Sequence, residues 1–182
     1  MPRTLGYHVC ISGYGLWLPG DERRHWSDAW DEQLGYIEPH KLHPGDPVRK
    51  RMAQERQAHP AVRHTAEMMA ASAQTYAHCA AASDWKIAAA AIEPTHTHLL
   101  LTYTERDIDN VVKWIKDQAT KAIHAQTPHQ GPVWCKGRWR VFLFEHSYWH
   151  NTKNYIERHN VRRGVGPRPY EFLSEELPEE LR

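Results

Sequence analysis

The sequence predicts an α+β domain of the ferredoxin-like (RRM-like) split βαβ type, with an antiparallel sheet, helices on one face and an extra C-terminal helix. Two observations lead to this fold class. The apolar patterns along the 182 residues follow the order strand, helix, strand, strand, helix, strand, helix. Strand-like runs alternate with a period of two, whereas helix-like runs repeat every three or four residues. The two consecutive strands in the middle should form a hairpin, which we expect at the centre of the sheet.

The first strand is predicted at Leu5–Ser12, where strand-forming residues alternate before two glycines end the run. Residues 17–59 are polar and rich in proline, glycine, charge and tryptophan, which indicates a long surface insertion with short helical pieces. A connection of this length in a compact domain is usually functional. Pro60 is typical of the first turn of a helix. The apolar seam of that helix consists of Val62, Ala66, Met69, Ala73, Tyr76 and Ala80.

The run Trp85–Ile92 alone fits a helix or a strand, but the nearby Pro94 and the strand-like run His96–Tyr103 favour a strand. The remaining elements are a helix capped by Thr104 or Asp107 and ending near Ile123, a loop at 124–132, a strand at Trp134–Phe144, and a helix at Ser147–His159. We expect residues 1–166 to form one catalytic domain, with 17–59 as its insertion, and 167–182 to be a loose acidic extension.

Composition is that of an ordinary globular protein, with 41% apolar and 25% charged residues and a net charge of +1. Three widely spaced cysteines form neither a disulfide framework nor a zinc pattern. No signal peptide is evident, and the apolar stretches are too short to cross a bilayer, so we expect a cytoplasmic protein; nucleoid association would follow only from the nucleic-acid chemistry considered below. Most of the fourteen histidines are expected on the surface: His25, His40, His43, His59, His64, His124 and His129.

Two local patterns, far apart in the chain, carry chemistry. His96 and His98 are two residues apart in a predicted strand, so their imidazoles project from the same face, as ligands of one metal must. Tyr155 and His159 are four residues apart in a predicted helix and share a side of it. Together they suggest metal-assisted attack of Tyr155 on a phosphodiester, with His159 as the third ligand. Asn160 is the reserve third ligand.

A basic band within residues 136–168 could follow a phosphate backbone, although a solvated charged surface explains it equally well. Exposed aromatic rings in this band would stack on unpaired bases. For Trp139 core packing is the favoured interpretation. The candidate DNA-binding residues are Trp134, Lys136, Arg138, Arg140, Trp149, Lys153, Arg158, Arg162 and Arg163.

These motifs, in this order, resemble the single-tyrosine HUH transposases, specifically the REP-associated tyrosine transposases and their insertion-sequence relatives. Residues 13–21 resemble the Tyr-Gly-Thr-Trp-Leu-Pro-Gly-Asp element of one subgroup. Residues 85–101 resemble a strand pair that ends in Met-Pro-x-His-x-His-Leu, and Trp134-Cys135-Lys136-Gly137 and Tyr155-Ile156 resemble Trp-x-x-Gly and Tyr-Ile elements. The resemblance implies nicking and joining of hairpin-containing single-stranded DNA through a 5′-phosphotyrosine, with Mg²⁺ or Mn²⁺. Relatives occur as monomers and as dimers that exchange the last helix, so a monomer or a homodimer is implied.

Three residues depart from the family pattern. Thr97 stands where a bulky apolar residue is usual between the two histidines, and points to the opposite face of the strand. Glu93 replaces the methionine before the proline, and His159 stands where asparagine or glutamine is common. Imidazole is a good ligand, so the role of His159 is kept, with a changed metal preference. An all-imidazole site suits Mn²⁺, Zn²⁺ or Co²⁺ better than Mg²⁺.

Two other functions fit the same residues. A domesticated, non-catalytic protein would bind single-stranded or hairpin nucleic acid with the basic and aromatic residues alone. A metal-dependent phosphoesterase would use water, and Tyr155 would then be structural. Tyr148 is a lesser candidate for the nucleophile, because no histidine follows it four residues later.

Overall fold

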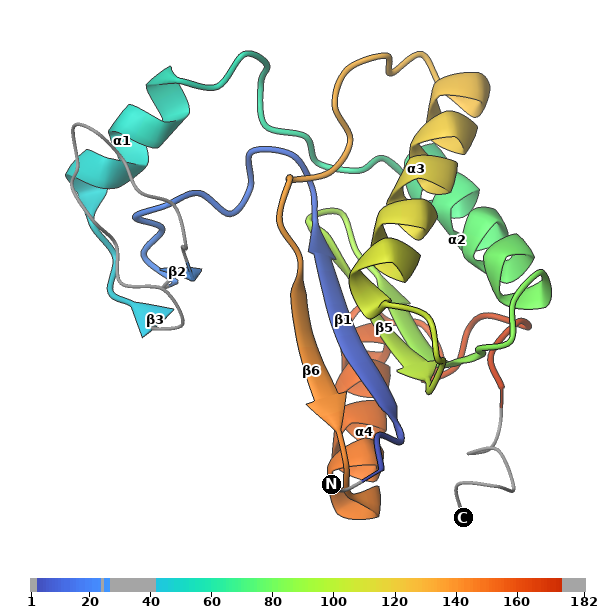
Figure 1. Cartoon of the computed structure of the whole chain (residues 1–182). Coiled ribbons are helices and arrows are strands. Elements are labelled where there is room, and N and C mark those ends of the chain that lie inside the picture. The colour runs from blue at the N-terminus through green and yellow to red at the C-terminus, as the bar shows by residue number, and fades with distance from the viewer. Residues whose placement is uncertain (1–2, 24, 27–41, 175–182) are drawn as a thin grey trace.

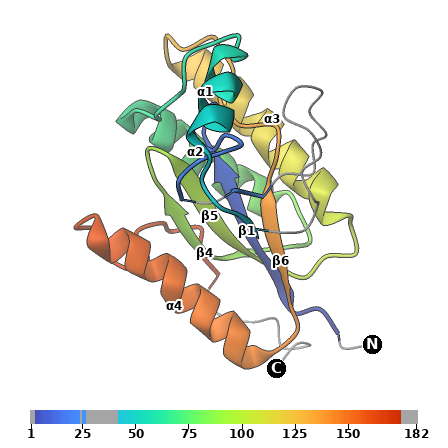
Figure 2. The ribbon, with the colours of Figure 1, turned by 90° about the vertical axis from the view of Figure 1, so that its left-hand side faces the viewer.

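The computed structural model describes residues 3–23, 25–26 and 42–174, and its main feature is a four-stranded antiparallel sheet. Its strands are β1 (Gly6–Ser12), β4 (Ile87–Ile92), β5 (His96–Thr102) and β6 (Trp139–Leu143). Helices α2 (Ala66–Ala81) and α3 (Ile108–Gln126) cover one face, and α4 (His146–Arg162) lies on the other (Figures 1 and 2). The predicted ferredoxin-like α+β fold, with an extra C-terminal helix, is confirmed.

The strand order is β4-β5-β1-β6, so one part of the predicted topology is wrong. The β4–β5 hairpin is not at the centre, because β4 is an edge strand and only β5 is an inner one. The crossover through α2 makes β1 and β4 parallel, and β5 lies between them, antiparallel to both. The strand that carries His96 and His98 is therefore flanked on both sides, by β4 and by β1.

The main core lies between the sheet and the helices α2 and α3. Asp107, one of the two predicted caps, caps α3 and accepts a hydrogen bond from the backbone N–H of Asn110 at 3.0 Å. Helix α2 begins at Ala66, not at Pro60, with Thr65 as its cap. Residues before Thr65 run extended instead, because the N–H of Val62 donates to the carbonyl of Tyr14 at 2.8 Å.

The later start of α2 changes its buried face. Met69 and Ala73 are only partly buried, although they still pack against the core. The fully buried positions are Met68, Ala71, Ser72, Thr75, Tyr76, Cys79 and Ala80. Similarly, α3 extends to Gln126, into the predicted loop, and β6 is shorter than the predicted strand.

The predicted insertion contains short elements, as expected, although residues 24 and 27–41 lie outside the described part of the chain. It carries β2 (His25–Trp26), β3 (Leu42–His43) and α1 (Pro47–Glu55), which lie together to one side of the sheet (Figure 1). The buried Asp21 ties this region together through ion pairs with Arg23 at 2.7 Å and Lys50 at 3.6 Å. Its hydrogen bonds to Arg23 hold the pKa of the Asp21 carboxyl at about 2.

The segment after α4 is not loose where it is described, up to Ser174. It lies along the edge strand β4, whose outward carbonyls would otherwise lack partners. Four donors bind these carbonyls: Ser174 N to Ile87 O (2.8 Å), Arg168 to Ala88 O (3.0 Å), Asn160 to Ala90 O (2.9 Å) and Arg163 to Ile92 O. Tyr170, Phe172 and Leu173 also pack against the main core. This segment therefore fastens the end of α4 to the sheet.

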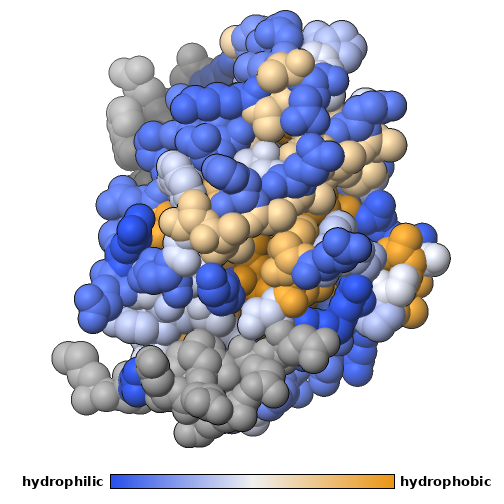
Figure 3. Space-filling model, turned by 90° about the vertical axis from the view of Figure 1, so that its right-hand side faces the viewer, coloured by the Kyte–Doolittle hydropathy of each residue, from blue (hydrophilic) through white to orange (hydrophobic). Residues whose placement is uncertain are grey.

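The surface on the side of α2 is mainly hydrophilic, and its apolar residues gather in a limited band (Figure 3). In the part of the chain that the structure describes, no helix combines the length and the apolar character needed to span a bilayer.

Candidate active site

The face of the sheet toward α4 carries the polar residues of the two inner strands. Successive side chains of β1 point to opposite faces of the sheet, so Val9 and Ile11 point into the main core and His8 and Cys10 lie on the other face. Cys10 is the register partner of His98 in β5, so these side chains emerge from the same face. The predicted projection of His96 and His98 from one side of a strand is what the structure shows.

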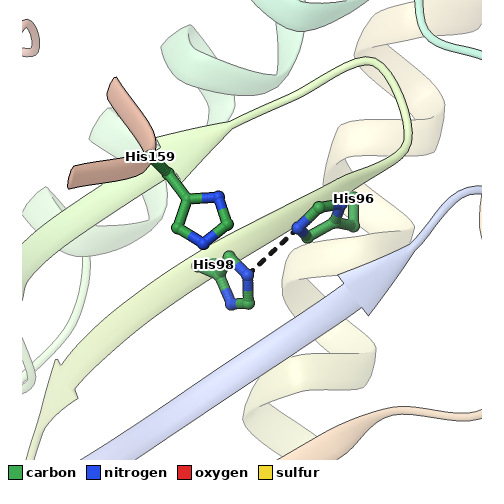
Figure 4. Close-up of side chains that lie close together, drawn as sticks. All are labelled: His96, His98 and His159. Carbon is green, nitrogen blue, oxygen red and sulfur yellow. Dashed lines mark hydrogen bonds between the residues drawn. The ribbon is translucent and has the colours of Figure 1, made fainter. Parts of the chain in front are cut away.

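Helix α4 brings His159 to the same place. The ring centroids of His98 and His159 are 4.8 Å apart, and those of His96 and His159 are 5.8 Å apart. The three rings face a common space (Figure 4), with one nitrogen of each within 4.8 Å of the others. The predicted set of three histidines therefore converges from a strand and a helix that are far apart in sequence.

The outer nitrogen of each ring has its own partner. Nδ1 of His96 lies 2.8 Å from Oγ1 of Thr95, and Nδ1 of His98 lies 3.1 Å from Nε2 of His8. Nδ1 of His159 lies 2.7 Å from Oε1 of Glu93. The Glu93 carboxylate only accepts, so it places the proton of His159 on Nδ1 and leaves the lone pair on Nε2. Thr95 and His8 can accept in the same way from Nδ1 of His96 and of His98.

This arrangement fits a divalent cation. The Nε2 atoms of His96 and His98 are 3.0 Å apart, and two lone pairs at that distance need a shared proton or cation between them. Nε2 of His159 is buried and has no hydrogen-bond partner. Metal-bound histidines characteristically donate their other N–H to an acceptor, as all three rings can here.

Burial favours the neutral form of His98, His8 and His96. It lowers the pKa of His98 to about 2, with help from the neighbouring His96 and His8. It also lowers the pKa of His8 to about 4 and the pKa of His96 below its usual value. Neutral imidazole is the form that binds metals, so His96 and His98 are in their ligating form at neutral pH.

Tyr155 lies beside the three rings and is still reachable from solvent. Its side chain is 44% exposed, and its ring centroid is 4.8 Å from that of His159 and 5.5 Å from that of His98. Partial burial raises the pKa of the phenol, whereas the positive charge of Arg162 acts in the opposite direction. Tyr148, two helical turns earlier, is about 10 Å away along the axis of α4. The geometry therefore favours Tyr155 over Tyr148 as a nucleophile.

Asn160, the reserve third ligand, does not face this site. It is fully buried, and its amide donates to the carbonyls of Ala90 and Pro167, each at 2.9 Å. The expectation for Asn160 is therefore wrong, because the residue next to His159 in a helix points in a different direction. Its role is to hold α4 and the following segment against β4.

Two of the predicted base-stacking rings are packing residues. Trp149 is 2% exposed and belongs to the apolar cluster beneath α4. Trp134 is 7% exposed, with its ring centroid 4.5 Å from that of His64. His64 is itself only 3% exposed, so its expected surface position is wrong as well. Trp139, for which core packing was favoured, is instead 39% exposed.

The candidate basic residues separate into groups. Lys136, Arg158 and Arg162 are exposed. Arg140 points to the α3 face and pairs with Asp109 at 2.9 Å, away from Tyr155. The other engaged residues are Arg138 (with Asp109), Lys153 (with Glu157, 3.9 Å) and Arg163 (with Ile92 O).

A cavity of about 380 Å³ adjoins Tyr155. Arg138 and Trp139 line it, together with His8 and His98. Trp17 and Arg23 of the insertion also reach it, and the guanidinium of Arg23 lies 4.2 Å from the centre of the Trp17 ring. The cavity thus joins the histidine site to an aromatic and basic wall.

Sequence reasoning missed two residues that contact the site, His8 and Glu93. The alternation of β1 puts His8 on the polar face, but only the β1–β5 register shows that it reaches His98. Glu93 was recognised as unusual, but its contact with His159 depends on how α4 crosses the sheet. Trp17 lay in the motif at residues 13–21 but was given no role, and Arg23 had no signal beyond its place in the insertion.

Comparisons with known proteins found a matching family and similar solved structures. The family described as "Transposase IS200 like" matches residues 61–159. A solved REP-associated tyrosine transposase bound to a REP hairpin shares 15% identity over 90% of this chain and 72% of its own, with a TM-score of 0.47. A candidate transposase from Deinococcus radiodurans R1 shares 17% identity over 87% of this chain and 93% of its own, with a TM-score of 0.43. A comparison with curated protein sequences gave no match.

Proposed function

Because the chain belongs to the IS200-like transposase family, whose members are tyrosine transposases, we propose that it nicks and rejoins single-stranded DNA through a covalent bond to Tyr155. One observation carries this proposal. The exposed phenol of Tyr155 lies against three imidazoles, each of which has one nitrogen within 4.8 Å of the corresponding nitrogens of the other two. A structural tyrosine would not need such a neighbourhood.

In the proposed reaction, Oη of Tyr155 attacks the phosphorus of a DNA phosphodiester. The new O–P bond replaces the bond from phosphorus to the 3′ oxygen, which leaves as a 3′-hydroxyl with the proton that the phenol gives up. The product is a 5′-phosphotyrosine. Attack by another 3′-hydroxyl reverses the step and joins new ends, so no nucleotide cofactor is consumed.

His96, His98 and His159 are the proposed ligands of a divalent cation, Mg²⁺ or Mn²⁺. When bound, such a cation would act as a Lewis acid on the scissile phosphate. The three imidazoles favour Mn²⁺ on ligand chemistry. Partial burial raises the pKa of the Tyr155 phenol above its ordinary value, so the phenol is protonated at neutral pH and has to give up its proton during the attack.

The proposed DNA path passes the cavity beside Tyr155. Trp139 offers a partly exposed ring for an unpaired base, and Arg138 is at the same wall. On α4, Arg158 and Arg162 follow Tyr155 by three and seven residues, which places their charges near its side of the helix. Lys136 and Lys153 extend the path, and hairpin-containing DNA is the proposed substrate class.

The proposed catalytic unit is residues 1–166, acting as a monomer or a homodimer on DNA in the cytoplasm. Helix α4 packs on the sheet of its own chain, so one chain supplies the tyrosine and all three histidines. The fastening of the segment up to Ser174 along β4 favours this arrangement over exchange of α4 between chains.

The test uses hairpin-bearing single-stranded oligonucleotides, labelled at the 3′ or the 5′ end and incubated with Mn²⁺ or with EDTA. With Mn²⁺, the 3′-labelled strand should shift to protein mobility on a denaturing gel, and the 5′-labelled strand should give a shorter free fragment. Tyr155→Phe should abolish the shifted band, whereas Tyr148→Phe is the matched control and should keep it.

Each alternative gives a different result. Metal-dependent cleavage that survives Tyr155→Phe and leaves no adduct would identify a phosphoesterase that uses water. Tight binding of the hairpin without any cleavage would identify a non-catalytic DNA-binding protein. An adduct that persists in Tyr155→Phe would refute the nucleophile.

A further inference from the structure

Two residues that depart from the family pattern touch each other. Glu93 stands in place of the usual methionine, and His159 in place of the usual asparagine or glutamine. They are 66 positions apart, yet Nδ1 of His159 lies 2.7 Å from Oε1 of Glu93.

The chemistry of the two side chains explains what this contact can do. The oxygen of an amide side chain can bind a cation directly, because the amide has no second tautomer that would place a proton on this oxygen. A neutral imidazole carries its proton on either nitrogen, and only the tautomer with the proton on Nδ1 leaves Nε2 free to bind. A carboxylate that accepts from Nδ1 selects this tautomer and fixes the ring orientation.

The local structure is suited to this role. The side chains of Glu93 and His159 are 17% and 13% exposed, so water competes little for their hydrogen bond. Glu93 lies in the tight turn between β4 and β5, where its N–H donates to the carbonyl of His96 at 2.9 Å. Its second oxygen is 3.7 Å from Nε2 of His96. The carboxylate thus sits on a rigid turn beside two of the three ligands.

We propose that Glu93 is a positioning residue that holds His159 with its Nε2 aimed into the metal site, and that Glu93 and His159 form one functional unit. The carboxylate also adds a negative charge next to the cation. This inference rests on the proposed metal site but concerns a residue outside its ligand set.

The test measures Mn²⁺ affinity by calorimetry on the purified full-length chain. Glu93→Met should weaken binding by about 10–100-fold, the usual cost of losing the partner of a metal-bound histidine. Glu93→Gln should lose less than Glu93→Met, because its amide oxygen still accepts from Nδ1. In the His159→Asn background, Glu93→Met should change the affinity by less than about threefold, because the pair is already broken.

A second readout is independent of the metal. In the metal-free wild type, nitrogen-15 spectra should show His159 protonated on Nδ1. In Glu93→Met the signal should move toward a mixture of tautomers. Glu105→Met, in the exposed turn at the other end of β5, is the matched control and should change neither readout.

Two results would overturn the inference. The first is a Glu93→Met variant with wild-type Mn²⁺ affinity and an unchanged His159 tautomer. The second is an equal loss of Mn²⁺ affinity on Glu93→Met in the wild-type and in the His159→Asn backgrounds. Both require a wild type that binds Mn²⁺. If the wild type itself binds no divalent metal, the proposed metal site fails, and the tautomer measurement alone then decides whether Glu93 orients His159.

Discussion

Neighbouring residues of strand β5 point to opposite faces of the sheet, one of which packs the main core while the other carries the histidine site. Thr97 and Leu99 are fully buried on the side of α2 and α3, where the main core is packed. His96 and His98, which alternate with them, face α4 and the cavity beside Tyr155. A site built on a strand whose other face is locked in the core has little freedom to shift, and such rigidity is what precise ligand placement needs.

The two faces also differ in how their helices are held. Helices α2 and α3 share a large apolar core with the sheet, whereas α4 rests on a smaller cluster around Trp149 and Ile156. The ring of Trp149 packs directly over Gly6 of β1, where any side chain would collide with it. The segment along β4 adds polar contacts. Placement of the tyrosine therefore depends on a few identifiable residues.

The largest expected effect comes from comparing substitutions at two adjacent residues of β5 that point to opposite faces of the sheet. His98→Ala should abolish Mn²⁺ binding and adduct formation, because it removes the central imidazole of the three. Leu99→Ala should lower the free energy of unfolding by about 2–5 kcal/mol, as expected for a buried leucine, and leave the metal affinity of the folded protein unchanged. Urea unfolding and calorimetry on both variants make the comparison.

The opposite results for His98→Ala and Leu99→Ala would contradict this prediction. If Leu99→Ala weakened metal binding as much as His98→Ala while still folded, the two faces would be coupled and the site would not be independent of the core. If His98→Ala destabilised the metal-free protein more than Leu99→Ala, the imidazoles would be mainly structural.

The second effect compares two tryptophans near α4. Trp149→Ala should cost about 3–5 kcal/mol of stability, because a fully buried ring leaves a cavity. Trp139→Ala should leave stability nearly unchanged and weaken binding of single-stranded DNA by about 1–3 kcal/mol, the usual value of one stacked base. Thermal unfolding and fluorescence anisotropy with a labelled oligonucleotide measure the two quantities. Equal DNA affinity of Trp139→Ala and the wild type would remove Trp139 from the proposed DNA path.

The sequence predicted those parts of the site that depend on local periodicity. A spacing of two in a strand fixed the common face of His96 and His98, and a spacing of four in a helix paired Tyr155 with His159. Both relations are properties of one element. The sequence ranked His159 above Asn160 as the third ligand but kept Asn160 in reserve, because which of the two faces the site depends on the rotation of α4 against the sheet.

What could not be predicted depends on contacts between elements. An aromatic residue in a basic stretch stacks on DNA or fills the core, and only the fold shows that Trp149 is buried and Trp139 is exposed. The start of α2 moved because residues before Thr65 pair with the backbone near Tyr14 and Pro94. Tertiary hydrogen bonds of this kind override the preference of proline for the first turn of a helix.

The smallest effect concerns a buried histidine outside the site. His64 has no contact with the three ligands, and its Nε2 lies 3.4 Å from the carbonyl of Val133. Burial lowers the pKa of His64 below its ordinary value of 6.5, with a smaller opposing contribution from the Val133 carbonyl. Below pH 6.5 the imidazole of His64 is therefore protonated in the unfolded chain but stays neutral in the folded protein.

The free energy of unfolding should consequently fall as the pH drops below 6.5, and this loss should stop once the lowered pKa of folded His64 is passed. One such group contributes a slope of at most about 1.4 kcal/mol per pH unit. Urea unfolding in EDTA, at several pH values, should show a shallower slope for His64→Gln, whose amide can still donate to Val133. If the free energy of unfolding fell equally with pH in the variant and the wild type, His64 would be able to take up its proton in the folded protein. The acid sensitivity of the fold would then come from the imidazoles of the site.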